Sequence, residues 1–102
     1  MNTVFFDRNS SVLTDAGRTQ LMENLDILQN CDLNVRIEGY SSRDERNGQQ
    51  LSEDRALAVK QYYIDNGIDE SRLSDMGMGT GGQTTKKGAA GQFRRVDTIP
   101  AN

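Results

Sequence analysis

The chain has 102 residues, with 12 lysines and arginines against 15 acidic residues, so its formal net charge is −3. It contains no histidine and one cysteine, Cys31, which excludes Ser–His, Cys–His and zinc-ligand sites and disfavours hydrolases and metalloenzymes. No basic face stands out as in a nucleic-acid binder, and no apolar run approaches the roughly 20 residues of a membrane span. A binding function that needs no cofactor is therefore the best starting hypothesis.

The N-terminal part of the sequence predicts a strand, a helix and a second strand. Thr3–Phe6 is a short run of β-branched and aromatic residues. Leu13–Asn30 carries leucines at the helical period, and Thr14 or Asp15 is a suitable N-cap. Leu33–Gly39 alternates apolar and polar residues, which is typical of a half-buried strand.

The remainder alternates loops with regular elements in the same way. In order, we expect a polar loop at Tyr40–Gly48, a helix that begins at Ser52 and ends at Gly67, a strand at Leu73–Met78, a glycine-rich loop at Gly79–Gly91, a strand at Phe93–Ile99 and a tail from Pro100. No linker interrupts this order, so residues 1–102 are expected to form one domain. The order predicts an α+β fold, a two-layer β-α-β-α-β-β sandwich with a four-stranded sheet and both helices packed on one face.

Arg55 interrupts the apolar face of the second predicted helix. The apolar stripe of this helix contains Leu51, Ala58, Val59 and Tyr62, and Arg55 falls in its middle. An arginine cannot lose its charge in this setting, and burying it without a partner costs several kcal/mol. The side chain must therefore be paired internally or open into a cleft.

Two interpretations of Arg55 remain open at this stage. The first is an internal salt bridge to Glu38, Asp44 or Asp97, or an arginine stem that covers the end of the helix. The second is an anion-binding arginine at the rim of a pocket that takes a carboxylate or a phosphate. The charged residues of the preceding loop, 43–46, can be a solvated turn, or their acids can lie opposite Arg55 and form a site of both charge signs for a zwitterion.

Five short motifs, in the right order, resemble those of OmpA-like domains. They are Val4-Phe5-Phe6-Asp7-Arg8-Asn9-Ser10 with Leu13-Thr14; Ile37-Glu38-Gly39-Tyr40-Ser41-Ser42; Leu51-Ser52-Glu53-Asp54-Arg55-Ala56-Leu57-Ala58-Val59 with Tyr62; Gly67-Ile68 and Arg72-Leu73 with Gly77 and Gly79; and Arg94-Arg95-Val96-Asp97. The resemblance covers about Thr3 to Thr98, nearly the whole chain. Each motif is weak alone, whereas their common order is specific.

This resemblance implies a β-α-β-α-β-β domain that holds peptidoglycan non-covalently in the periplasm. Such domains usually form the C-terminal part of outer-membrane proteins, Pal-type lipoproteins and MotB-type flagellar stator proteins. The resemblance therefore implies a periplasmic domain of a longer exported, outer-membrane-associated protein. Its implied partner is the diaminopimelate of the peptidoglycan stem peptide.

The resemblance also implies a site. In the family, an Asp pairs with the diaminopimelate ammonium and a helix Arg takes its carboxylate. Arg55 matches that Arg, Asn9 matches the family Asn near the pocket, and Arg94 matches the first of two arginines in the last strand. The family His and Asp are replaced by Tyr40 and Ser42, and the loop after them is two residues shorter than the common pattern.

An altered diaminopimelate pocket is therefore expected. Asp44 can replace the missing Asp if the shorter loop turns it inward, and Glu45 is the weaker candidate. The candidate ligand-binding residues are Asn9, Ser41, Ser42, Asp44, Asn47, Arg55 and Arg94. The alternative is an OmpA-like domain that no longer binds peptidoglycan and serves in protein-protein interaction or dimerisation, with other envelope proteins or with itself. In that case Arg55 should be paired internally.

Overall fold

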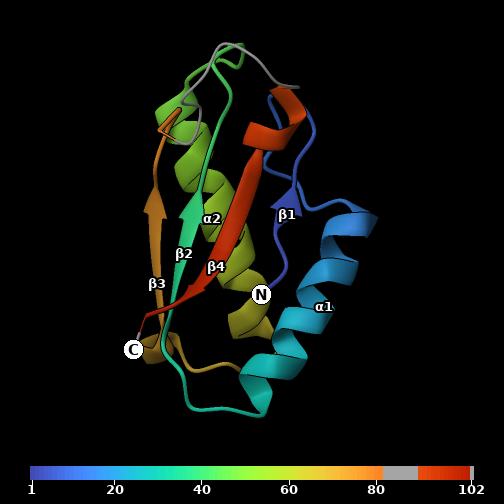
Figure 1. The fold of residues 1–102 in the computed structure, drawn as a ribbon, viewed down its shortest axis with the longest axis vertical. Helices are drawn as coiled ribbons and strands as arrows, with labels where there is room; N and C mark the ends of the chain where they lie inside the picture. Colours follow the sequence, from blue (N-terminus) through green and yellow to red (C-terminus); the bar gives the residue numbers. More distant parts are fainter. Residues whose placement is uncertain (82–89, 102) are drawn as a thin grey trace.

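The computed structural model describes residues 1–81 and 90–101. Four strands and two long helices follow one another in the expected order (Figure 1). They are β1 (Val4–Phe5), α1 (Asp15–Gln29), β2 (Val35–Gly39), α2 (Gly48–Asp65), β3 (Leu73–Gly77) and β4 (Arg95–Pro100), with short 3-10 turns at Glu70–Arg72 and Ala90–Phe93. Most of the predicted glycine-rich loop lies outside the described residues.

The strands form one mixed sheet in the order β1-β4-β2-β3. β2 lies in the middle, parallel to β3 and antiparallel to β4, and it pairs Ile37 with Asp75 on one side and with Thr98 on the other. β1 is antiparallel to β4 and closes the opposite edge. Both helices cover the same face of this sheet (Figure 1), which confirms the predicted α+β two-layer fold.

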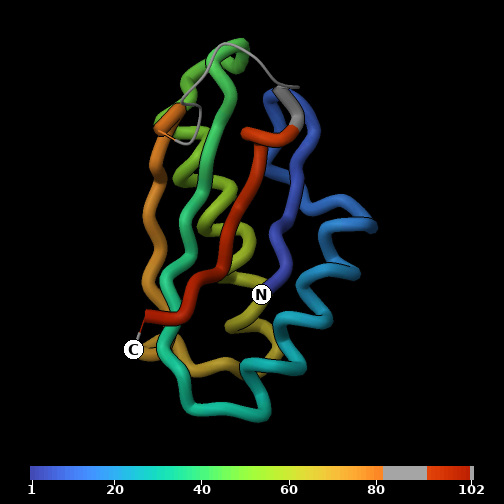
Figure 2. The backbone as a smooth tube through the Cα atoms, viewed as in Figure 1, coloured from blue at the N-terminus to red at the C-terminus, as the bar shows by residue number. Residues whose placement is uncertain are grey.

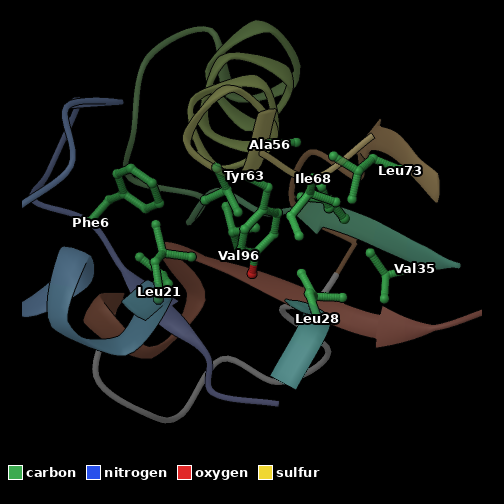
Figure 3. Packing of buried hydrophobic residues seen from close by; sticks show 12 residues of the cluster. Phe6, Leu21, Leu28, Val35, Ala56, Tyr63, Ile68, Leu73 and Val96 are labelled. Atoms are coloured by element: carbon green, nitrogen blue, oxygen red, sulfur yellow. The ribbon is translucent and has the colours of Figure 1, made fainter. Parts of the chain in front are cut away.

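The core lies between the helices and the sheet (Figure 3). Its members are Val4, Phe6, Leu21, Leu28, Val35, Ile37, Ala56, Val59, Tyr63, Ile68, Leu73 and Val96. The period-two pattern of β2 is confirmed, since Val35 and Ile37 point into the core and Arg36 is exposed. The hydroxyl of Tyr63 is also satisfied inside, because it lies 2.7 Å from Thr98 Oγ1 and accepts a hydrogen bond of 3.2 Å from Asn24 Nδ2.

The predicted start of α1 is confirmed, whereas the predicted start of α2 is wrong. Thr14 is the N-cap of α1, and its hydroxyl accepts a hydrogen bond of 3.0 Å from the Gly17 backbone. α2 begins at Gly48 rather than at Ser52, so the prediction placed its start four residues too late. The reason is Asn47, whose left-handed backbone (φ 48°) directs its carbonyl to the Leu51 amide at 2.9 Å. The glutamine-containing segment 48–51 then forms the first turn.

Three loops meet at one end of the sheet (Figure 2). The segment after β1 contacts the loop between β2 and α2, where the Arg46 amide donates to Asn9 Oδ1 at 3.0 Å. The same loop reaches the end of β3, because the Ser41 amide donates to the Gly79 carbonyl at 2.8 Å. This end of the sheet therefore collects the residues of the candidate site. Within residues 1–81 and 90–101, none of the helices has the length and apolarity that a membrane crossing needs.

Candidate functional site

Arg55 lies wholly inside the protein, between α2 and the loops that follow β1 and β2. Its side chain has 0% exposure, and its guanidinium donates to three backbone carbonyls. Nε donates to Ser10 at 2.8 Å, Nη1 to Tyr40 at 3.0 Å and Nη2 to Asp7 at 3.1 Å. The Phe6 ring lies below the guanidinium, with its centre 5.4 Å from Cζ. Two of the five N–H donors remain after these bonds.

Glu45 takes both remaining donors. Its Oε1 accepts from Arg55 Nη1 at 2.8 Å and its Oε2 accepts from Nη2, in a bidentate ion pair. The Glu45 side chain is as inaccessible as that of Arg55, with 0% exposure. All five guanidinium donors therefore end on acceptors of the protein itself.

The partner of Arg55 differs from the three acids considered from the sequence. Glu38 and Asp97 lie on the sheet face away from the helices and pair with neighbouring arginines, Arg36 and Arg95 respectively. Asp44 pairs with Arg8 instead. The internal salt bridge is thus present, but Glu45 makes it. The loop turns inward at Glu45, which the sequence offered only as the weaker replacement for the family Asp.

The Glu45 carboxylate is held by four donors. Besides Arg55, the Ser42 amide donates to Oε1 at 2.9 Å and the Asn9 amide donates to Oε2 at 2.8 Å. Burial raises the pKa of the Glu45 carboxyl, but the hydrogen bonds from Arg55, Ser42 and Asn9 and the charge of Arg55 outweigh it, so this pKa lies below its ordinary value. We call these four donors, with the three residues that carry them, the carboxylate cradle.

Local backbone conformation builds the cradle. The Glu45 amide donates to the Ser42 carbonyl at 3.1 Å, and this turn brings the Glu45 side chain back to the Ser42 amide. Asn9 adopts a left-handed backbone (φ 56°), which asparagine tolerates better than most residues. Its amide then faces Glu45 while its side chain accepts from the Arg46 amide. Sequence periodicity carries no signal for these loop conformations.

Asp44, the predicted replacement for the family Asp, lies on the outer side of the loop. Its carboxylate accepts from the Ser42 hydroxyl and lies 3.5 Å from Arg8 Nε. That hydrogen bond from Ser42 lowers the Asp44 pKa, and the charges of Arg8 and Arg94 act in the same direction. The side chain remains 46% exposed, so it is an ionised acid available at the surface.

Among the described residues, the other predicted members of the site, Ser41, Asn47 and Arg94, make no hydrogen bond to the Glu45 carboxylate. Ser41 is buried, and its hydroxyl has no hydrogen-bond partner within the described part of the chain. Asn47 begins α2, as described above. Arg94 lies at the other side of the segment after β1, where its Nε donates to the Phe6 carbonyl at 3.1 Å. The structure thus brings Asn9, Ser42 and Arg55 together on one carboxylate and places the remaining candidates around them.

Two cavities flank this region. The smaller one, about 340 Å³, opens beside the cradle and is lined by Asn9, Arg46, Asn47, Gln50, Leu51 and Asp54. The larger one, about 610 Å³, lies between β1 and α1 and reaches Arg94. The smaller cavity shares Asn9 with the cradle and offers both charge signs. In the part of the chain that the structure describes, no cluster of three or more acidic or cysteine side chains has the arrangement of a metal site.

The fold is shared with several solved bacterial proteins. A peptidoglycan-associated lipoprotein from Burkholderia pseudomallei is 19% identical with a TM-score of 0.87, covering 97% of this chain and 89% of that one. The C-terminal domain of Helicobacter pylori MotB is 14% identical with a TM-score of 0.90, covering 100% and 86%. The cell wall anchor of the type VI secretion system from Pseudomonas aeruginosa is 22% identical with a TM-score of 0.83, covering 98% and 80%. At these identities the likeness establishes the fold.

Sequence comparison gives a narrower result. The search among curated proteins yields no significant match. The family model described as the OmpA family matches residues 5–96, which is most of the chain and includes the whole of α1, β2, α2 and β3 with part of β1 and β4. The chain therefore belongs to the OmpA family.

Proposed function

We propose that this domain is a non-covalent peptidoglycan-binding module that anchors a bacterial envelope protein to the cell wall. Membership of the OmpA family supports the proposal, as do the structural relatives named for peptidoglycan association and cell-wall anchoring. The domain would then act in the periplasm, as part of an outer-membrane-associated protein, and would bind without catalysing a reaction.

The observation that carries the proposal is the carboxylate cradle around Arg55. A buried guanidinium and two backbone amides already hold one carboxylate there in bidentate geometry. Diaminopimelate in a stem peptide presents a carboxylate next to an ammonium group. The cradle suits the carboxylate, and the exposed Asp44 or the cavity acid Asp54 suits the ammonium.

A second function is favoured by a specific observation. Every donor of Arg55 ends on this protein's own acceptors, which is what we expect of a domain that has lost its ligand. Such a domain would serve as a protein-interaction or dimerisation module. The sheet face opposite the helices carries exposed Phe5 and Met76 near its two edges, and a partner would contact that face.

Cosedimentation with purified diaminopimelate-containing sacculi separates these two functions. The proposal predicts that the wild-type protein pellets with sacculi and that Asp44→Asn pellets less. Glu70→Gln, which removes one exposed charge at the far end of the sheet, should pellet like the wild type. Absence of the wild-type protein from the pellet, together with a dimer mass by light scattering, would contradict wall binding and favour the interaction module.

A further inference from the structure

Arg55 has no donor left for a ligand while Glu45 stays in place. Both side chains have 0% exposure, so a second carboxylate has no path to the guanidinium in this arrangement. Any anion that pairs with Arg55 must first replace one of its present acceptors. The acceptors are three backbone carbonyls and one side chain.

The backbone carbonyls are poor candidates for replacement. Tyr40 is held at the end of β2, where its amide donates to the Arg95 carbonyl at 2.8 Å. The Asp7 carbonyl also accepts from the Ser10 amide at 3.1 Å, so moving it would break a turn. The Glu45 carboxylate, by contrast, ends a flexible side chain on a loop, and its rotation leaves the sheet and α2 unchanged.

We infer that Glu45 is a built-in occupant of the carboxylate cradle, and that a ligand carboxylate binds Arg55 only by exchanging with it. This makes Glu45 the residue that decides whether the cradle accepts an external carboxylate. The identity of a natural ligand rests on the proposed function, whereas the exchange itself concerns any small carboxylate.

The donor geometry supports a carboxylate as the exchanging group. Each oxygen of Glu45 receives one guanidinium N–H and one backbone N–H. A carboxamide would place its own N–H groups against two of these donors, and a neutral ligand would leave a buried positive charge unpaired. A free carboxylate satisfies all four donors.

Two contacts of the loop between β2 and α2 hold Glu45 in the cradle. The Asp44 carboxylate lies 3.5 Å from Arg8 Nε, and the Arg46 amide donates to Asn9 Oδ1 at 3.0 Å. These contacts tie the residues on either side of Glu45 to the segment after β1. Release of Glu45 therefore breaks its own four hydrogen bonds, while Asp44 and Arg46 beside it stay tied to the segment after β1.

The test removes the occupant and supplies a carboxylate from solution. Glu45→Ala, Glu45→Gln, Glu70→Ala and the wild type are melted in sodium acetate and in sodium chloride of the same ionic strength. We expect acetate to raise the Tm of Glu45→Ala saturably, by about 4 °C or more at saturation. The wild type and Glu70→Ala should show no gain over chloride, because Glu45 keeps the cradle filled in both. Glu45→Gln should gain less than Glu45→Ala, because its carboxamide occupies the cradle without pairing the charge of Arg55.

Each outcome bears on the inference. If Glu45→Ala is unfolded in chloride, the folded fraction in acetate replaces Tm as the readout, and refolding by acetate alone supports the exchange. Equal behaviour of Glu45→Ala in acetate and chloride contradicts it. So does an acetate response of the same size in the wild type, because the cradle would then accept carboxylate without losing Glu45.

A second titration, with meso-diaminopimelate, separates this inference from the proposed function. With both correct, Glu45→Ala should bind diaminopimelate at least about tenfold more tightly than the wild type, since no internal carboxylate competes. Acetate rescue without binding of diaminopimelate or sacculi leaves the exchange standing and removes the proposed function. Wild-type binding to sacculi without acetate rescue of Glu45→Ala supports the proposed function and contradicts the exchange.

Discussion

Arg55 and Glu45 form a bidentate ion pair from which solvent is excluded, with the charge of each satisfied by groups of the same chain. The pair joins α2 to the loop between β2 and α2. Through the Asn9 amide and the Ser10 carbonyl it also joins both to the segment after β1. It therefore fixes the relative positions of three segments at one end of the sheet.

Arg55→Ala is expected to destabilise the domain by about 3–5 kcal/mol, because Glu45 would remain as an unpaired buried charge. Urea unfolding followed by circular dichroism measures the change. The double variant Arg55→Met with Glu45→Leu should recover part of the loss, since neither charge is then left unpaired, while the backbone groups that the pair now satisfies lose these hydrogen bonds. A double variant no more stable than Arg55→Ala would contradict the pairing as the source of the effect.

The stability of the domain should fall in acid through Glu45. Its folded-state pKa lies below its ordinary value of about 4.3, so the pair stabilises the fold above that pH. The contribution is lost as the pH falls below about 4.3 and through the folded-state pKa. Unfolding free energies at pH 7, 5 and 3 check this, with the gap between wild type and Glu45→Gln narrowing toward pH 3. A gap that stays constant over this range would be the contrary result.

Gly39→Ala should be strongly destabilising. A Cβ at this position would lie 2.0 Å from the Ser52 carbonyl oxygen and 3.0 Å from the Ala56 amide, so β2 would have to move away from α2. Because the obstructing atoms belong to the helix backbone, we expect a loss of about 3 kcal/mol or more. Ser74→Ala, on the exposed side of β3, is the control and should stay near wild-type stability. Equal stability of the two variants would contradict this close approach.

Tyr63→Phe tests the buried polar group at the centre of the core. Its hydroxyl contacts Thr98 Oγ1 at 2.7 Å and Asn24 Nδ2 at 3.2 Å, and removing it leaves both partners short of a bond. We expect a loss of about 1–3 kcal/mol in the free energy of unfolding. Tyr62→Phe, in the neighbouring position of the same helix, should change stability less. An unchanged Tyr63→Phe would mean that the two partners find other bonds.

Periodicity in the sequence was sufficient to predict the elements that build the core. Burial of one face produces both the alternation through Val35 and Ile37 and the leucine spacing of α1. These patterns can therefore be recognised from the sequence alone. The same reasoning marked Arg55 as a charge inside an apolar stripe. That side chain is buried and paired, as one of the two interpretations required.

The partner of Arg55 was harder to predict, because a loop supplies it. Glu38 and Asp97 were wrong candidates, because each follows a core residue on its strand and so points to the other face of the sheet. Whether Asp44 or Glu45 reaches Arg55 depends on the turn that begins at Ser42, and the hydrophobic pattern of a sequence does not predict such a turn. The early start of α2 has the same origin, in the left-handed backbone of Asn47.

Titration of the wild-type protein with a diaminopimelate-containing stem peptide, followed by NMR at Arg55 and Glu45, tests peptidoglycan binding through the cradle most directly. Binding with exchange predicts that the Arg55 Nε–H resonance and the Glu45 carboxyl carbon shift together and saturably. The Glu45 carboxyl should then titrate at the ordinary glutamate pKa. Unshifted resonances of both residues at millimolar peptide would contradict binding at this site.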